Sequence, residues 1–162
     1  GGLYMQYFAR RYPKDVQGLL LVDSMHRDQL IRVKAAAPGV YRMTNVLTFL
    51  MGGTMRREVI SSPSTAAEIE ALPETGDVPT IVLSSTLPST GETPAFRTLA
   101  AQLQNEIATA YVARRHDFVP GSGHYIQRDQ PQTVINAARE LARCETKGVS
   151  FAINRQVAAE PQ

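Results

Sequence analysis

The sequence of 162 residues has little cysteine and no long apolar run. Its one cysteine, Cys144, excludes an internal disulfide bond and, for want of a stronger signal, favours a cytoplasmic location as the expectation. No stretch of about 18 consecutive apolar residues occurs, so no membrane span is expected. The first residues also lack the charged and apolar regions of a signal peptide.

The sequence also has no large excess of positive or negative charge. The 17 basic and 15 acidic residues leave a net charge of +2. Nucleic-acid binders usually carry a basic stripe, whereas the arginine pairs here are far apart along the chain: Arg10-Arg11, Arg56-Arg57 and Arg114-Arg115. We interpret these pairs as solvated surface and expect no nucleic-acid partner.

Apolar periodicity and turn residues predict helices that alternate with strands. Helices are expected over residues 2–12, 40–51, 64–72, 93–109 and 131–143. Strands are expected over residues 16–22, 78–83 and 113–119, because short and nearly continuous apolar runs are typical of strands buried on both faces. Pro63 and Pro73 bracket the helix over 64–72, and Ser64 or Thr65 with Glu68 resembles a capping box.

This order of elements predicts an α/β fold, with a parallel sheet flanked by helices. Residues 1–143 would form the folded unit, with 24–77 as a helical insertion and 144–162 as a loose tail. Three strands are few for such a sheet, and the first helix has no strand before it. We therefore expect another part of the same domain to precede Gly1.

Chemistry-bearing residues follow two of the predicted strands. In open parallel sheets, functional groups collect beyond the carboxyl ends of the strands. Asp23 ends the first predicted strand, and His124 closes the loop after the third. A carboxylate that hydrogen-bonds an imidazole orients the ring and stabilises its protonated form. Asp23 and His124 are thus candidates for two members of a nucleophilic triad.

The segments around His124 and Gly1 resemble the α/β-hydrolase superfamily. Val119-Pro120-Gly121-Ser122-Gly123-His124, followed by Asp129-Gln130-Pro131, is similar to the loop that carries the family's catalytic histidine. Gly1-Gly2-Leu3 is similar to the segment after the nucleophile elbow, Gly-x-Ser-x-Gly. The resemblance covers residues 1 to about 143 and implies a partial α/β-hydrolase fold in which 24–77 is the cap.

The resemblance also implies which catalytic parts the chain holds. Gly1 would be the last glycine of the elbow, so the nucleophilic serine would stand two residues before it. Gly1 and Gly2 would let the helix start pack closely under the elbow turn. His124 would be the base, while both oxyanion donors would lie upstream. We expect this chain by itself to be inactive.

The acid of the triad has alternatives. Many family members carry it after the strand placed here at 78–83, where this sequence offers only Glu92. Others carry it after the strand that follows the nucleophile helix, where Asp23 stands, and we favour Asp23. Asp28 is a weaker choice. Asp23 could instead simply cap a turn at the strand end.

Other residues have lesser roles in this interpretation. Met25 and His26 are expected to line the substrate site, and His116 is expected to be structural. A metal site is not expected, because no helical pair of histidines or pair of cysteines supports one. Met and Leu side chains in the insertion, such as Met43, Leu47, Leu50, Met51 and Met55, would suit an apolar acyl substrate, although they could equally pack the cap onto the core.

The sequence therefore predicts a serine hydrolase acting on carboxylic esters or related acyl bonds, without a cofactor. Two alternatives stay open. One keeps the fold but has an Asp nucleophile, as in dehalogenases and epoxide hydrolases of the family. The other is a non-catalytic, hydrolase-like module that binds a ligand or partner.

Overall fold

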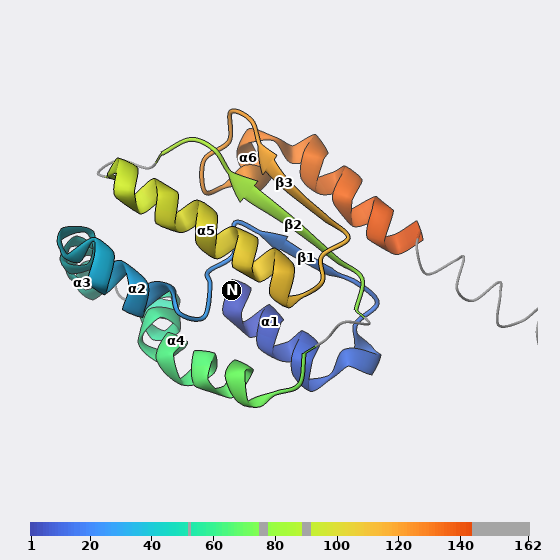
Figure 1. Ribbon diagram of the computed structural model, residues 1–162, viewed down its shortest axis with the longest axis horizontal. Helices are drawn as coiled ribbons and strands as arrows, with labels where there is room; N and C mark the ends of the chain where they lie inside the picture. The colour runs from blue at the N-terminus through green and yellow to red at the C-terminus, as the bar shows by residue number, and fades with distance from the viewer. Residues whose placement is uncertain (52, 75–77, 89–91, 144–162) are drawn as a thin grey trace, which may run out of the picture.

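The computed structural model describes residues 1–51, 53–74, 78–88 and 92–143 (Figure 1). The predicted tail over 144–162, including Cys144, lies outside the described residues, as does Gly52. The described chain folds as a parallel three-stranded sheet in the order β1-β2-β3, covered by helices on both faces. The predicted fold class, a parallel α/β sheet flanked by helices, is confirmed.

The first and third strands are shorter than predicted, whereas the second has the predicted length but begins two residues later. They span β1 (Leu19–Val22), β2 (Thr80–Ser85) and β3 (Arg115–Val119). Before β1 the chain forms a short 3-10 helix, η1 (Pro13–Asp15), because the fixed φ of proline suits a helical first turn. Gly18 then passes close to Leu141, and a Cβ at Gly18 would lie 3.1 Å from that side chain.

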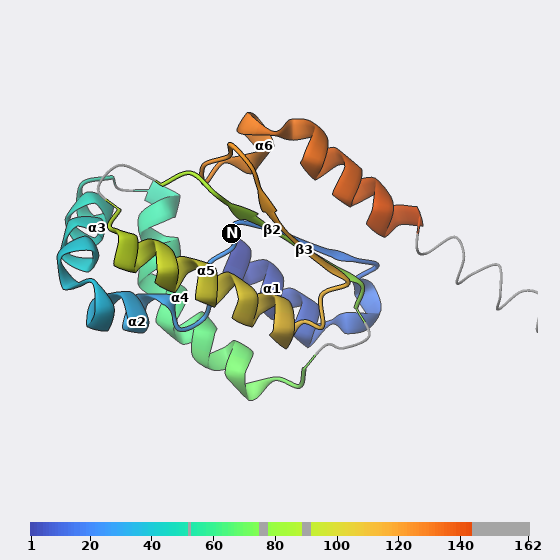
Figure 2. The same cartoon turned by 45° about the horizontal axis from the view of Figure 1, so that its top comes forward.

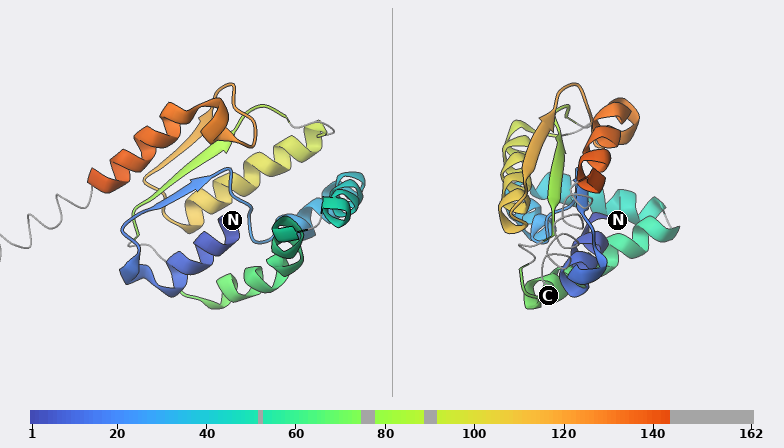
Figure 3. Two further views of the ribbon diagram at one scale, coloured as in Figure 1. Left: turned by 180° about the vertical axis from the view of Figure 1, so that it is seen from behind. Right: turned by 90° about the vertical axis from the view of Figure 1, so that its right-hand side faces the viewer.

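Helices pack on opposite faces of the sheet (Figure 3). On one face, α1 (Gly2–Arg11) and α5 (Pro94–Ala110) cover an apolar cluster that includes Leu21, Val82 and Tyr111. On the other, a helix over 131–143 and the short α6 (Ile126–Asp129) cover Ile81, Leu83 and their neighbours. The sheet is thus buried on both sides, which explains why β1 and β2 are almost continuously apolar.

The chain between β1 and β2 is helical, as predicted, and no strand occurs among its described residues. It forms α2 (Gln29–Ala36), α3 (Pro38–Met51) and α4 (Gly53–Ala71). Of these, α2 packs on α5 through Val33, Leu99 and Leu103, α3 packs on α2, and α4 lies beside α1 (Figure 2). The apolar pattern of the sequence does not predict α2, because the apolar residues of this segment do not distinguish it from the residues on either side.

The prediction of a short helix over 64–72 behind a capping box is wrong, because α4 continues through Pro63. Proline lacks the N–H that would bond the carbonyl of Val59 one turn back. The Ser62 hydroxyl donates to that same carbonyl at 2.7 Å. Ser64 likewise donates to the Ser61 carbonyl at 2.8 Å instead of capping a helix start. The Ser62 hydroxyl thus replaces the backbone bond that proline removes.

Among the described residues, no helix has both the length and the apolar character needed to cross a membrane.

Candidate functional site

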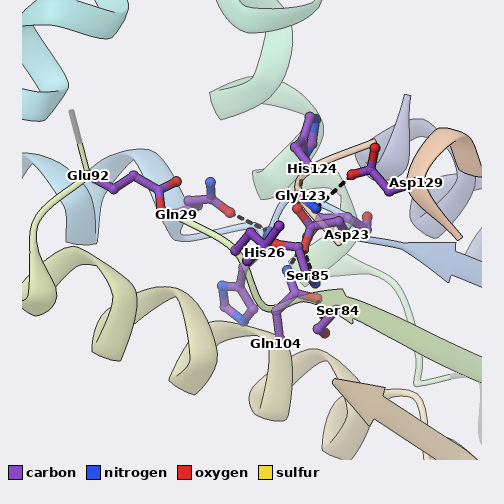
Figure 4. A network of polar contacts seen from close by, with 12 residues as sticks. Asp23, His26, Gln29, Ser84, Ser85, Glu92, Gln104, Gly123, His124 and Asp129 are labelled. Atoms are coloured by element: carbon purple, nitrogen blue, oxygen red, sulfur yellow. Dashed lines mark hydrogen bonds and ion pairs between the residues drawn. The ribbon is translucent and has the colours of Figure 1, made fainter. Parts of the chain in front are cut away.

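The carboxyl ends of the strands bring Asp23 and His124 together, although 101 residues separate them in the chain (Figure 4). His124 Nδ1 lies 2.8 Å from Asp23 Oδ2, and because a carboxylate can only accept, the ring nitrogen donates. The other oxygen, Asp23 Oδ1, accepts the backbone N–H of Ser85 at 2.9 Å. Both oxygens of Asp23 are therefore engaged, and the carboxylate is fixed relative to the end of β2.

These contacts decide the charge of Asp23. Its side chain is 15% exposed, and burial alone would raise its pKa. The hydrogen bonds from His124 and from the Ser85 backbone outweigh burial, so the pKa of Asp23 lies below its ordinary value. Asp23 is consequently a carboxylate at neutral pH.

The pKa of His124 is shifted in the opposite direction to that of Asp23. The hydrogen bond to Asp23 raises the pKa of its imidazole, and burial only partly offsets that effect. The charge of Glu92 adds a smaller rise. With Nδ1 bound to Asp23, Nε2 has no hydrogen-bond partner among the described residues, and the side chain is 61% exposed. Nε2 is therefore free to exchange a proton with a bound molecule.

The loop that carries His124 is held by short polar contacts. Gly121 has φ +69°, a conformation that favours glycine. The buried Ser122 donates to the Val119 carbonyl at 2.8 Å, and its own carbonyl accepts the N–H groups of Thr86 and Leu87 at 3.0 and 2.9 Å. These contacts tie the loop to the end of β2.

Asp129 completes the loop by accepting the Gly123 N–H at 2.8 Å. The sequence places Asp129 in the histidine-loop motif, but the motif alone gives it no role. Its position directly before the Gln130-Pro131 start of the last helix is the signal that could have indicated one. The N–H just before His124 is thus fixed by a side chain six residues further on.

A cavity of about 800 Å³ opens beside Asp23 and His124. Its apolar wall includes Met25, Leu47, Phe96 and Phe118, and its polar wall includes Gln29 and Arg97. Met25, expected to contact substrate, does line it. Of the insertion's apolar side chains, Leu47 also lines it and Met43 and Leu50 do not, although all three are exposed. The side chains of Met51 and Met55 lie outside the described residues.

The alternative acids do not bond His124. Glu92 lines the same cavity, but its carboxylate pairs with Arg97 Nη1 at 3.4 Å. Arg97 is in turn held by the Thr86 carbonyl at 2.5 Å. Asp28 lies near His26 and Arg27 instead. Of these three carboxylates, only Asp23 contacts the imidazole of His124.

The expectation that His26 lines the substrate site is corrected by the structure. His26 lines a separate cavity of about 140 Å³, together with Arg10 and Tyr111. Its Nδ1 accepts the backbone N–H of Asp28 at 3.0 Å, a contact that fixes the ring. Burial lowers the pKa of His26, and the charges of Asp28 and Glu106 oppose that effect only in part. His26 therefore lines a different cavity from the one beside His124.

The start of the chain lies at the same edge of the sheet, where α1 begins beside the end of β1 (Figures 1 and 3). Gly2 packs so closely against the segment after Asp23 that a Cβ there would lie 2.0 Å from Ser24 Oγ. A Cβ at Gly1 would meet nothing within 4 Å. The amino group of Gly1 is near enough to lower the pKa of His124 slightly.

His116 lies in β3, is partly buried, and joins a polar chain with the buried Ser84 and Gln104. Its Nε2 is 2.8 Å from Ser84 Oγ, and burial lowers its pKa. Among the described residues, no group of three or more His, Cys, Asp and Glu side chains is arranged to hold a metal ion.

Comparisons of this chain with models of protein families, with curated proteins and with solved structures give no match. Inference about function therefore rests on the geometry of the site and on the resemblance of its motifs.

Proposed function

We propose that this chain is the C-terminal part of an α/β-hydrolase that cleaves carboxylic esters or related acyl bonds by Ser-His-Asp catalysis. The observation that carries the proposal is the 2.8 Å contact between His124 Nδ1 and Asp23 Oδ2 at the mouth of a large cavity. The serine would stand two residues before Gly1, as the resemblance implies.

The tautomer of His124 supports a role as general base. With its Nδ1 proton donated to Asp23, the neutral imidazole has a lone pair on Nε2. Nε2 would accept the proton of the serine hydroxyl during attack on the acyl carbon and would then donate it to the leaving group. In the second half of the reaction it would take a proton from the water that attacks the acyl-serine, and would return that proton to the serine oxygen as the bond between the acyl carbon and that oxygen breaks.

The charge of Asp23 supports a role as the orienting acid. Its pKa is lowered, so it carries a full negative charge while His124 gains and loses a proton. The N–H of Ser85 holds the second oxygen, which prevents the carboxylate from turning away from the ring. Asp23 would thus fix the His124 tautomer and stabilise the imidazolium without itself accepting the proton.

The position of α1 supports a nucleophile upstream. α1 begins beside the end of β1, at the edge of the sheet where Asp23 meets His124. A residue two positions before Gly1 would therefore lie close to the imidazole. The close approach of Gly2 to Ser24 is the tight packing that a nucleophile elbow needs from its last glycines.

The first experiment is to read the residues upstream of Gly1 and to express the longer chain. Gly-x-Ser-x-Gly-Gly, with the serine two residues before Gly1, supports the esterase. An Asp at the serine position would favour the dehalogenase or epoxide-hydrolase alternative, and no elbow at all would favour a non-catalytic module.

The second experiment measures hydrolysis of p-nitrophenyl esters by the longer chain, its His124→Ala variant and residues 1–162 alone. We expect turnover by the longer chain, a loss of at least roughly 10³-fold in His124→Ala, and none by residues 1–162. Turnover that survives His124→Ala at full rate would overturn the mechanism.

A further inference from the structure

The backbone of Asp23 has a conformation that its neighbours must maintain. Its φ of +44° lies in the left-handed region, which is unfavourable for an L-residue, although Asp tolerates it better than most. The N–H of Asp23 still bonds the Leu83 carbonyl at 2.7 Å, as the last rung of the β1–β2 pairing. The direction of the carboxylate therefore depends on what holds the chain immediately after Asp23.

Two buried glutamines hold that chain, and Figure 4 labels one of them, Gln104. Gln104 of α5 donates to the Ser24 carbonyl at 2.8 Å. From α1, Gln6 donates to Ser24 Oγ and to the Met25 carbonyl, both at 2.9 Å. Only 2% of Gln6, 4% of Ser24 and 8% of Gln104 is exposed, so water hardly competes for these bonds.

The amide of Gln104 is itself oriented by a directional chain. The Ser84 hydroxyl donates its single proton to Gln104 Oε1 at 3.1 Å. Ser84 Oγ must then accept from His116 Nε2 at 2.8 Å, and burial keeps His116 neutral by lowering its pKa. With Oε1 facing Ser84, the NH₂ group of Gln104 faces the Ser24 carbonyl.

We propose that Gln104 is a positioning residue for the Asp23–His124 pair, and that it acts by holding the Ser24 carbonyl. Its bond fixes the peptide after Asp23, which sets the left-handed turn and aims Oδ2 at His124 Nδ1. The inference rests on the proposed function for its catalytic meaning, but the geometry that it explains is present in this chain.

The test measures the pKa of His124 by NMR titration of the imidazole signals, assigned with a His124→Gln variant. In Gln104→Met, which keeps the length of the side chain but removes both polar groups, we expect the pKa of His124 to fall toward that of a free imidazole. The charged groups that act on His124 are Asp23, Glu92 and the amino group of Gly1, and only the position of Asp23 should change.

The Gln104→Glu variant distinguishes a positioning role of Gln104 from a role in packing and from an effect of added charge. A carboxylate would keep an acceptor for Ser84 but lose the donor to the Ser24 carbonyl. If Gln104 acts through Ser24, the pKa of His124 falls in Gln104→Glu as well. If Gln104 only fills space, the new negative charge leaves that pKa unchanged or raises it.

Gln102→Met is the matched control, because Gln102 is exposed on the same helix. We expect it to leave the pKa of His124 unchanged. The thermal midpoint of each variant checks that it is folded. A folded Gln104→Met protein with an unchanged pKa of His124 would overturn the proposal.

Kinetics of the longer chain give a second readout. Gln104→Met should lower kcat, by up to about 10²-fold, more than it raises KM, because Gln104 exposes only 8% of its surface and so presents little of itself to the cavity that it helps to line, whereas its loss misaligns the base. If the longer chain hydrolyses no ester yet Gln104→Met still lowers the pKa of His124, the proposed function fails and the positioning inference stands. If the longer chain is a working esterase but Gln104→Met leaves that pKa unchanged, the positioning inference fails and the proposed function stands.

Discussion

Two histidines of this chain lie near carboxylates, yet their pKa values are shifted in opposite directions. The hydrogen bond with Asp23 raises the pKa of His124, whereas burial lowers that of His26. Carboxylate oxygens of Asp28 and Glu106 lie 3.9 and 3.6 Å from the ring of His26, which is beyond hydrogen-bonding distance.

The atom that faces Nδ1 explains the difference. At His124, Nδ1 meets a carboxylate oxygen, so the protonated ring is stabilised. At His26, Nδ1 meets the N–H of Asp28, which requires an unprotonated nitrogen, and the side chain is only 9% exposed. Nearby negative charge is therefore not enough to make a histidine basic; a direct acceptor and access to solvent are needed as well.

The largest expected effect comes from Asp23→Asn, which would make the surroundings of His124 more like those of His26. The amide oxygen can still accept from Ser85, but its NH₂ would face Nδ1 and impose the wrong tautomer. We expect kcat for ester hydrolysis by the longer chain to fall roughly 10³–10⁴-fold. Asp15→Asn, at an exposed position in η1, is the control and should have no effect. An active Asp23→Asn enzyme would return the role of acid to Glu92.

The next largest effect concerns the packing of Gly2 against Ser24, which lies between Asp23 and His26 in the chain. In Gly2→Ala the new Cβ would overlap Ser24 Oγ, so we expect a loss of about 1–3 kcal/mol in the free energy of unfolding. Gly39→Ala is the matched control, because a Cβ at Gly39 meets nothing within 4 Å in α3 and alanine favours a helix. Urea unfolding of both variants measures the difference. Equal free energies of unfolding for the two variants would mean that the segment around Ser24 moves aside at little energetic cost.

The opposite pKa shifts predict opposite pH dependences of stability. The raised pKa of His124 adds stability that is complete below the unfolded-state value near 6.5 and is lost as pH rises through the folded value. The lowered pKa of His26 removes stability as pH falls below about 6.5.

Denaturant unfolding at several pH values, with His124→Gln and His26→Gln, measures this contrast. The cost of His124→Gln should be greater at low pH than at high pH, and that of His26→Gln should be greater at high pH. The same pH trend in both variants would contradict the assigned shifts.

The smallest expected effect is that of Glu92→Gln. Glu92 acts on His124 through its charge alone, much as Asp28 and Glu106 act on His26. We expect a slight fall in the pKa of His124 and less than about a tenfold change in kcat, because the hydrogen bond to Asp23 remains. NMR titration and ester kinetics measure the two effects. A loss as large as that of Asp23→Asn would mean that Glu92 replaces Asp23 during turnover.

Much of the fold could be predicted from local sequence. The apolar run Leu19-Leu20-Leu21-Val22 and the run around Ile81-Val82-Leu83 became the two most buried strands, since only a sheet covered on both faces hides such runs. Pro94 after Thr93 marked the start of α5, where the Thr93 hydroxyl accepts the Phe96 N–H. The extent of α4 was missed, because the hydroxyl of Ser62 compensates for Pro63 in a way that no spacing rule includes.

The candidate site likewise has features that the local sequence predicts and features that depend on the tertiary structure. The sequence by itself determined that Asp23 and His124 follow strands, because strand ends are set by local apolar runs and turn residues. Only the tertiary structure decided that these two meet and that His26 lines a different cavity, since a hydrogen bond across 101 residues depends on strand order and register. The contacts of Gln6 and Gln104 with Ser24 were likewise decided by packing, because neither glutamine lies in a motif.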